Sequence, residues 1–458
     1  MRRGPMVIAL VFLPFMTAYL LSEMFRNVNG VVGRILRAEL GIGPEQLGLL
    51  TAVFLAAIAG SQIFVGVALD RYGPRRVVGS LMLIAAAGAV LFAADDFGRM
   101  VAGRFLIGLG MAACWAAAFK ANATWFRPER LALANSATLG LAGLGALAAT
   151  LPTELIIART HWHNVFFGLA AIAAVLAAVI WLVVPEPRAD AARGATDHAS
   201  IGDAFRGLLA IATSRVFWKI GPVSFLAQGV WLAYQGLWAG AWMADVDRLA
   251  PVPAATTLMW LAMAIVAGQL GFGLIADRLQ RRGISLWTTM AATTTGFVVV
   301  QAMLLLAPSP GVSRALWIAY GLFTAGPIFT YALLSLALPS ALSGRAISLL
   351  NLFATLAGFV LQYGVGVIIE GWSPLAEGPH LDGHYPADAH RTALGVMVAM
   401  QGVALVWMLW PGWRPQPAAR GNSVRSGGCC RMPATHGLTP SADGLGAWRG
   451  SRAVSGLS

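Results

Sequence analysis

Charged residues are scarce in this chain of 458 residues. Asp, Glu, Lys and Arg make up 11% of it, whereas they make up about a quarter of an ordinary soluble domain. Hydrophobic residues make up 58%, and the mean hydropathy is +0.70. This composition excludes an ordinary soluble protein and predicts an integral membrane protein.

Cysteine is also rare. Cys114 lies within an apolar run, and Cys429 and Cys430 lie near the C-terminus, so the sequence offers no disulfide framework and no metal-ligand spacing. We find no nucleophile paired with a base and no glycine-rich loop that would cradle the phosphates of ATP. We therefore expect no enzyme, no metal site and no cofactor.

Long apolar runs, in contrast, are abundant. A helix of about 20 residues crosses the ~30 Å hydrocarbon core of a bilayer. The first run follows a basic head, as in a signal peptide, but it reaches spanning length without a small-residue cleavage site, so we expect it to remain as a helix. Twelve spans are expected, at 6–33, 46–69, 77–94, 99–121, 132–158, 164–184, 217–243, 254–276, 284–307, 313–337, 346–370 and 393–412.

Acidic residues are fewer than basic ones, 20 against 32, and the net charge is +12. Such an excess can indicate a nucleic-acid partner. Here, however, most Lys and Arg residues fall in loops that share one side of the bilayer if both termini lie on that side, and cytoplasmic loops carry this excess. We expect a protein of the plasma (inner) membrane with both termini in the cytoplasm, in contact with lipid and not with nucleic acid.

Charge and proline also divide the chain. A polar, proline-bearing stretch separates the two sets of six predicted spans, and the C-terminal stretch is rich in Gly, Ser, Arg and Pro without periodicity. We expect a six-helix bundle at 1–184, a cytoplasmic linker at 185–216, a second bundle at 217–412 and a disordered cytoplasmic tail at 413–458.

The two halves repeat a motif. "GVALDRYGPRR" follows the second span and "GLIADRLQRRG" follows the eighth, and both place Gly four residues before Asp-Arg. One interpretation is a basic loop that only obeys the charge bias. The pattern also resembles the cytoplasmic-loop signature of the major facilitator superfamily of secondary transporters. The residues concerned are Gly66, Asp70, Arg71, Gly73, Arg75 and Arg76, with Gly273, Asp277 and Arg278 in the second copy.

This resemblance implies an all-α membrane protein in which twelve transmembrane helices form two pseudo-symmetric six-helix bundles around a central cavity. It implies transport by alternating access, with Asp70 and Arg71 as residues of a cytoplasmic latch. The second copy departs from the signature because Gln280 replaces the second glycine. The latch role of that copy is therefore less well supported.

Arg104 lies one turn inside the fourth span, in "GRFLIGLGMAA". An arginine within the membrane costs about 2.5–3.5 kcal/mol on insertion scales, so it should face a cavity or a partner. Alternatively, its side chain snorkels to the outer headgroups. The Arg-x-x-x-Gly-x-Gly pattern is similar to the fourth-helix motif of the superfamily, which is associated with proton coupling in some members.

The first span contains the stretch "AYLLSEMFRNVNGVV", which is unusually polar for a membrane helix. Tyr19, Glu23, Arg26, Asn27 and Gly30 recur at spacings of three and four and share one helix face. Glu23 and Arg26 can pair, which lowers the insertion cost. The pair could serve only to hold helices together. Alternatively, Arg26 is similar to the first-helix arginine that binds the anionic group of the substrate in the organophosphate and organic-anion transporters of the superfamily.

Helices seven and ten supply further polar candidates. The stretch 220–238 of helix seven lacks the second cationic residue of the organophosphate exchangers, which favours a monoanion, or a substrate bound by hydrogen bonds and aromatic faces, over a doubly charged phosphate. Gly326-Pro327 is expected to break helix ten, where freed carbonyls can line a cavity. The candidate substrate residues in these helices are Gln228, Trp231, Tyr234, Gln235, Thr324 and Tyr331.

Together these patterns predict a monomeric secondary transporter of a small solute, most plausibly an organic anion, with a proton as the coupling ion. Glu23 would carry the proton, and the resemblance adds Arg104 to the coupling residues. Three alternatives stay open: a nitrate or nitrite porter, a drug-efflux porter, and a transporter-like sensor or scaffold that binds a ligand without moving it.

Overall fold

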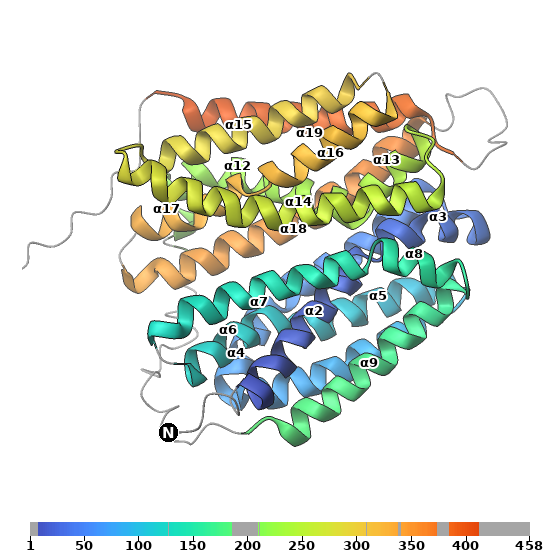
Figure 1. Ribbon diagram of the computed structural model, residues 1–458, viewed down its shortest axis with the longest axis horizontal. Coiled ribbons are helices and arrows are strands. Elements are labelled where there is room, and N and C mark those ends of the chain that lie inside the picture. Colours follow the sequence, from blue (N-terminus) through green and yellow to red (C-terminus); the bar gives the residue numbers. More distant parts are fainter. Residues whose placement is uncertain are drawn as a thin grey trace, which may run out of the picture. The chain divides into compact units, whose positions relative to one another are not determined.

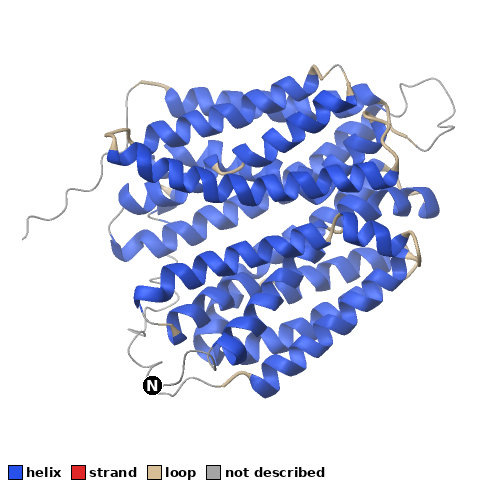
Figure 2. Ribbon diagram, viewed as in Figure 1, coloured by secondary structure: helices blue, strands red, loops and turns tan. Residues whose placement is uncertain are grey.

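The computed structural model describes residues 8–126, 128–185, 209, 211–307, 309–337, 340–372 and 384–411. Within these ranges the chain consists of helices and short connections, and they contain no strand (Figure 2). These ranges belong to one compact unit, Met1–Ala418. Most of the expected linker and all of the expected tail lie outside the described residues.

Two groups of helices make up this unit. The first group contains η1 (Ile8–Phe12), α2 (Leu13–Asn27), α3 (Asn29–Leu40), α4 (Pro44–Phe92), α5 (Phe97–Met111), α6 (Cys114–Trp125), α7 (Pro128–Ala148), α8 (Leu151–Ile157) and α9 (Trp162–Val183). The second group contains α12 (Arg215–Ala233), η3 (Tyr234–Trp238), α13 (Ala239–Asp245), α14 (Pro251–Arg281), α15 (Leu286–Leu305), α16 (Pro310–Phe323), η4 (Gly326–Ile328), α17 (Phe329–Ala337), α18 (Ser340–Trp372) and α19 (Ala387–Leu409). Figure 1 shows the helices of the first group, blue to green, packed side by side, and those of the second group, yellow-green to red, beside them.

Nine helices in the described part of the chain are long and apolar enough to cross a membrane. The first, seventh and tenth predicted spans are also helical, but each is interrupted. The first is divided by a turn at Val28, the seventh contains the π-helix η3, and the tenth contains the 3₁₀-helix η4. These three predicted spans are therefore not among the nine long apolar helices.

The helix α4 contains two predicted spans within its 49 residues. They meet at Gly73, whose φ of 78° and ψ of 161° are not helical. A residue without a Cβ adopts this positive φ without strain, and Pro74 can follow because it occupies the first turn of the next helix. In the second half, Gly283 has the corresponding positive φ, 84°. The turn glycine of the second copy is thus present, but it lies three residues after Gln280.

Candidate functional site

Five predicted spans are interrupted. The first, seventh and tenth are described above, the fourth is divided between α5 and α6 at Ala112 and Ala113, and the fifth is divided between α7 and α8 at Ala149 and Thr150. Such irregular helix segments are frequent at functional sites, and within a membrane they are tolerated where protein or a cavity satisfies the backbone. Most of the polar residues predicted to bind substrate lie within a few residues of these interruptions.

Glu23 and Arg26 form the predicted ion pair on α2. The Glu23 residue is 9% exposed and the Arg26 side chain 20% exposed, so the pair is largely removed from solvent. The guanidinium of Arg26 also lies 5.6 Å from the ring centroid of Trp231 in α12. A cation over an aromatic face is favourable, especially when desolvated. The pair therefore lies where the first group of helices meets the second.

Asn27 and Tyr19 flank this pair. The Nδ2 of Asn27 donates to the backbone oxygen of Glu23 at 2.7 Å, while its Oδ1 is buried and has no partner among the described residues. Tyr19 is partly exposed and packs against the core. The predicted polar stripe of the first helix is therefore assembled around Glu23.

Gln228 and Tyr331 connect helices seven and ten. The hydroxyl of Tyr331 donates to Gln228 Oε1 at 3.1 Å, and Gln228 Nε2 donates to Ser224 Oγ at 2.9 Å. Gln235 is 8% exposed, and its Oε1 has no partner among the described residues. Buried polar atoms without partners are rare in folded proteins and are candidates for binding a ligand or a water molecule.

Two predicted residues lie elsewhere. Tyr234 is 1% exposed, and its ring packs with those of Trp317 and Tyr320 inside the second group. Thr324 is also buried, and its hydroxyl donates to the backbone oxygen of Gly321 at 2.7 Å. The structure does not bring these two side chains to Arg26.

Arg104 is completely buried. Its Nη1 donates to the backbone oxygen of Phe25 at 2.8 Å, and the guanidinium lies 5.1 Å from the ring centroid of Phe54. The Nε and Nη2 atoms have no partner among the described residues. The alternative in which Arg104 snorkels to the headgroups is therefore wrong. The arginine instead binds the helix that carries Glu23 and Arg26.

A second ion network lies at the other end of the first helix, and the sequence analysis missed it. Arg37 donates from Nη1 and Nη2 to the two carboxylate oxygens of Asp245 at 2.9 and 2.8 Å. His390 and His384 contact the same carboxylate at 2.9 and 3.0 Å. Tyr385 covers the guanidinium, with 4.2 Å between Arg37 Cζ and its ring centroid. The network joins α3 of the first group to α13 and α19 of the second.

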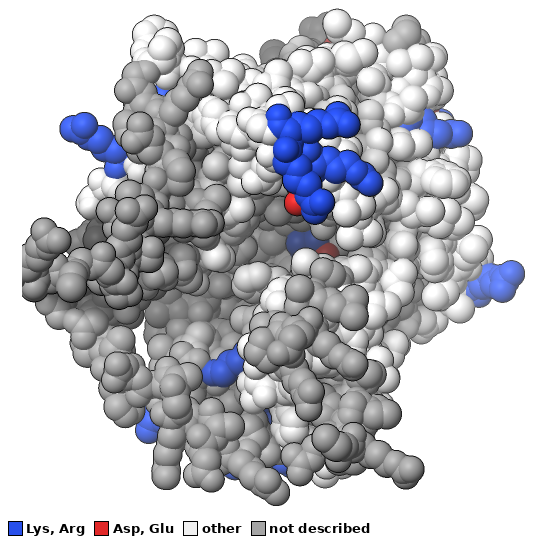
Figure 3. Space-filling model, turned by 60° about the vertical axis from the view of Figure 1, so that its left-hand side comes forward, with Lys and Arg blue, Asp and Glu red and all other residues white. Residues whose placement is uncertain are grey.

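Glycines allow the two groups to approach closely at this end. A Cβ added to Gly240 would lie 2.0 Å from the backbone oxygen of Gly30, and one added to Gly48 would lie 3.4 Å from Cα of Gly366. Small residues at such positions are typical of close helix packing in membranes. In the space-filling view of Figure 3, basic and acidic side chains lie at the floor of a hollow.

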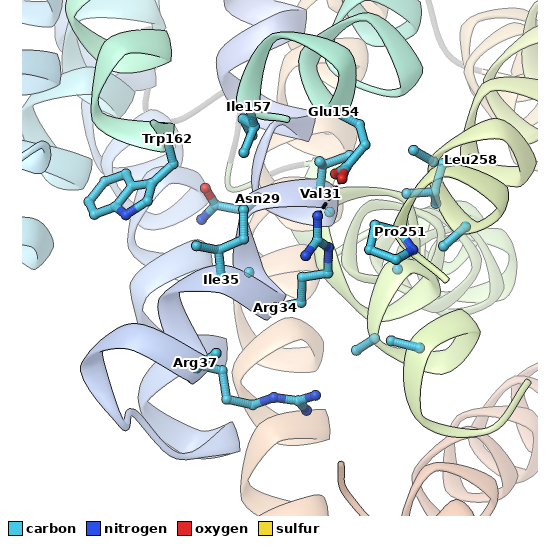
Figure 4. A pocket seen from close by; sticks show the side chains of 18 of the residues that line it. Asn29, Val31, Arg34, Ile35, Arg37, Glu154, Ile157, Trp162, Pro251 and Leu258 are labelled. Carbon is cyan, nitrogen blue, oxygen red and sulfur yellow. Dashed lines mark hydrogen bonds and ion pairs between the residues drawn. The ribbon is translucent and has the colours of Figure 1, made fainter. Parts of the chain in front are cut away.

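A cavity of about 760 Å³ lies beside this network (Figure 4). Arg34 of α3 forms an ion pair with Glu154 of α8 within it. Arg248 lies at its edge with a φ of 52°, an uncommon backbone conformation for a residue with a side chain. Asn29 donates to Thr51 Oγ1 at 2.9 Å and keeps a buried Oδ1 without a partner among the described residues.

The loop that follows Asp245 in the sequence contains another acidic residue, Asp247. Asp247 accepts a hydrogen bond from Ser313 Oγ at 2.7 Å. Burial raises the pKa of this carboxyl from its ordinary value of 3.8 to about 6, and the hydrogen bond from Ser313 opposes that shift only in part.

Comparison with known families bears on this arrangement of interrupted helices around buried ion pairs. A model of the Major Facilitator Superfamily matches residues 15–362, which is most of the chain. The chain belongs to this superfamily. This match confirms the predicted family. Members of the superfamily are transporters, so this membership also confirms the expectation that the chain is not an enzyme.

Individual relatives are similar over shorter stretches. The "Probable sulfoacetate transporter SauU" of Cupriavidus necator is 31% identical over 156 residues, which cover 34% of this chain and 36% of that protein. The "Nitrate/nitrite transporter NrtP" of Nostoc punctiforme is 28% identical over 127 residues, which cover 28% of this chain and 25% of that protein. The chain thus aligns with only about a third of the length of these curated relatives, or less.

Solved structures match over nearly the whole fold. A crystal structure of a bacterial homologue of the human lysosomal transporter Spinster, described as inward-facing and occupied, aligns with a TM-score of 0.72. The alignment covers 87% of this chain and 96% of that chain at 16% identity, so it shows the fold alone. The predicted all-α membrane fold is confirmed.

The superfamily loop signature is described only in part. The side chain of Asp70 lies outside the described residues, so its latch role stays a prediction. Arg71 is exposed and lies 5.4 Å from the ring centroid of Tyr72, while Arg75 Nε donates to the backbone oxygen of Trp181 at 2.9 Å. A Cβ added to Gly66 would have no atom of another element within 4 Å.

The second copy of the signature is solvent-facing. Asp277 forms an ion pair with Arg281 at 2.7 Å, one turn further along the same helix. Arg278 is exposed, and Gly273 has no atom within 4 Å of an added Cβ. These contacts are local to α14. Their gating role likewise stays a prediction.

Proposed function

We propose that the chain is a secondary transporter that carries a small organic anion bearing a carboxylate or sulfonate group, and that Arg26 binds this group. The observation that carries the proposal is the position of Arg26, which pairs with Glu23 on one side and lies over Trp231 of the other helix group on the other. A planar guanidinium suits a carboxylate or sulfonate through paired hydrogen bonds. The similarity to a sulfoacetate transporter supports this class of substrate.

Proton coupling would follow from the same pair. An anion that binds Arg26 competes with the Glu23 carboxylate for the guanidinium. Because a carboxylate that loses its cationic neighbour in a buried site is more easily protonated, the anion and a proton would bind together. Arg104, which binds the backbone of the same helix through Phe25, would hold that helix in position.

Alternating access would open the end closed by Arg37 and Asp245. These two residues lie on different helix groups, so the groups cannot separate at that end while the pair is intact. The loops that carry Asp70 and Arg71 would close the opposite end. The division into bundles at 1–184 and 217–412, the monomeric state and the cytoplasmic termini stay predictions that accompany this scheme.

Thermal unfolding of the purified protein tests the substrate site. We would add methanesulfonate, nitrate, phosphate and a neutral sugar to the native protein, to Arg26→Gln and to Arg391→Gln. The last is a matched control, because Arg391 forms an ion pair at the same spacing of three with exposed Asp388. A ligand at a hundred times its Kd stabilises the folded state by about 2.7 kcal/mol.

We expect methanesulfonate, a monoanion, to raise the melting temperature of the native protein and of Arg391→Gln, and not of Arg26→Gln. Equal stabilisation of all three proteins would contradict the role of Arg26. Stabilisation by nitrate alone would favour the inorganic-anion porter. Flux into vesicles then separates a transporter from a sensor that binds without moving its ligand.

Accumulation in vesicles under a pH gradient tests the coupling. Glu23→Gln should bind the anion but equilibrate it without accumulation, because Gln cannot take up a proton. The control Asp388→Asn removes a carboxylate from an exposed ion pair and should accumulate the anion normally. If Glu23→Gln still accumulates the anion against a gradient, Glu23 is not the coupling residue.

A further inference from the structure

A second cavity lies on the outside of the first helix group, and its lining shares no residue with the proposed substrate site. Its volume is about 640 Å³, and it lies between α4, α5 and α9. Its walls are apolar side chains: Phe64, Val65, Ala68, Val77, Leu81 and Leu109. We call this cavity the lateral groove. Phe64 is 75% exposed, so the groove opens to the surroundings of the helices and not to the protein interior.

The length of the lateral groove matches one leaflet. Its lining runs along α4 from Ser61 to Tyr72, and the eleven steps between these residues span roughly 16 Å at a helical rise of about 1.5 Å per step. The hydrocarbon core of a bilayer is about 30 Å thick, so one leaflet contributes about half of that. The groove therefore extends from the membrane surface to about the middle of the bilayer.

The surface end of the lateral groove is basic. Arg76 lines it and is exposed, and Tyr72 lies beside it. Arg71 and Arg75 belong to the same loop, and Arg75 is anchored to the backbone oxygen of Trp181, which forms the opposite wall. Trp181 in turn packs on Gly79, where an added Cβ would lie 1.9 Å from its ring. The wall and the basic end are thus held together.

We propose that the lateral groove binds one anionic phospholipid, with an acyl chain along the apolar walls and the phosphate at Arg76. The apolar lining and the length fit an acyl chain, and the charge at the surface end fits an anionic headgroup. Basic pockets at the ends of membrane helices bind acidic headgroups in this way. With the orientation expected from the charge bias, the lipid belongs to the inner leaflet. This inference does not depend on the transported substrate.

Binding to delipidated protein in detergent tests the proposal. Phosphatidylglycerol and phosphatidylcholine with identical acyl chains would be titrated, and bound lipid counted by native mass spectrometry. Two pairs of variants isolate the groove. Arg76→Gln is matched with Arg282→Gln, an exposed arginine of the corresponding loop in the other half, and Ser80→Phe is matched with Ala87→Phe, also exposed on the same helix two turns away.

We expect one phosphatidylglycerol to bind saturably and more tightly than phosphatidylcholine. Arg76→Gln should weaken it about fivefold, the fold-change that corresponds to the ~1 kcal/mol of one basic side chain near a headgroup. Ser80→Phe should abolish it by filling the groove, and both control variants should bind normally. Size-exclusion profiles establish that each variant is folded.

Three results would overturn the proposal. Equal binding of the two lipids would show that the groove does not distinguish an anionic headgroup from a zwitterionic one. Equal weakening by Arg76→Gln and Arg282→Gln would show a general surface attraction. Finally, competition by glycerol phosphate as strong as by the whole lipid would show that the acyl chain contributes nothing, and therefore that the groove is not the site.

Discussion

Removal of the Asp245 carboxylate should open the end of the protein that it closes. Asp245 is fully buried and is bonded by Arg37, His384 and His390. Removing one partner of a buried ion pair costs about 3–5 kcal/mol, because it leaves a charge without compensation. In an open state Arg37 would be hydrated, so Asp245→Asn would penalise only the closed state.

The expected magnitude follows from that difference. Asn retains one acceptor oxygen, so we take the lower end of the range, and about 3 kcal/mol changes the ratio of open to closed protein by about 150-fold. Leu237→Cys can report this change, because Leu237 is 2% exposed and lines the cavity of Figure 4. The three native cysteines would first be replaced by Ser.

Labelling of this cysteine with a membrane-impermeant maleimide is the assay. We expect the labelling rate to rise by at least tenfold in Asp245→Asn and in Arg37→Gln, and the double variant should not exceed the larger single effect because the two residues form one unit. Asp388→Asn, which breaks an exposed pair, should leave the rate unchanged. A folded Asp245→Asn protein with the native rate would refute the reasoning that this network holds the end closed.

Three further predictions concern single residues. Gly240→Ala should raise labelling at position 237, since its Cβ would collide with the Gly30 oxygen; Gly402→Ala, with open space around it, should not. Arg104→Met should leave the melting temperature equal or higher while abolishing transport, because a buried cation is often replaced without loss of stability; a large drop in melting temperature would contradict this. Asp247→Asn should stabilise the protein above pH 6 and change little below pH 4. The reason is that the raised pKa of about 6 makes native stability fall as pH rises from 3.8 through 6, and melting curves across that range test it.

Local spacing explains what the sequence could predict. Glu23 and Arg26 lie three residues apart on one helix, so their pairing follows from helix geometry. The break at Gly326-Pro327 and the turn at Gly73 follow equally from the residues at those positions. In each of these cases a few neighbouring residues are enough to predict the local structure.

Long-range contacts could not be predicted in this way. Arg37 and Asp245 are 208 positions apart, and only the packing of the two helix groups brings them together. A signal was present, since Asp245 is an acid just beyond the end of a predicted span. Tyr234 shows a different limit. The π-helix that begins there changes the register of helix seven, so a stripe drawn with regular α-helical spacing does not predict which face Tyr234 occupies.

The Glu23–Arg26 pair also determines whether the membrane potential or the pH gradient can drive the proposed transport cycle. If one singly charged anion and one proton occupy the pair together, the loaded protein carries the same net charge as the empty protein. The electrical potential across the membrane then neither drives nor opposes the loaded step. A difference of one pH unit, equivalent to about 1.4 kcal/mol, supports tenfold accumulation by itself. An uptake rate that is independent of voltage but steeply dependent on pH is the electrical signature of this pair.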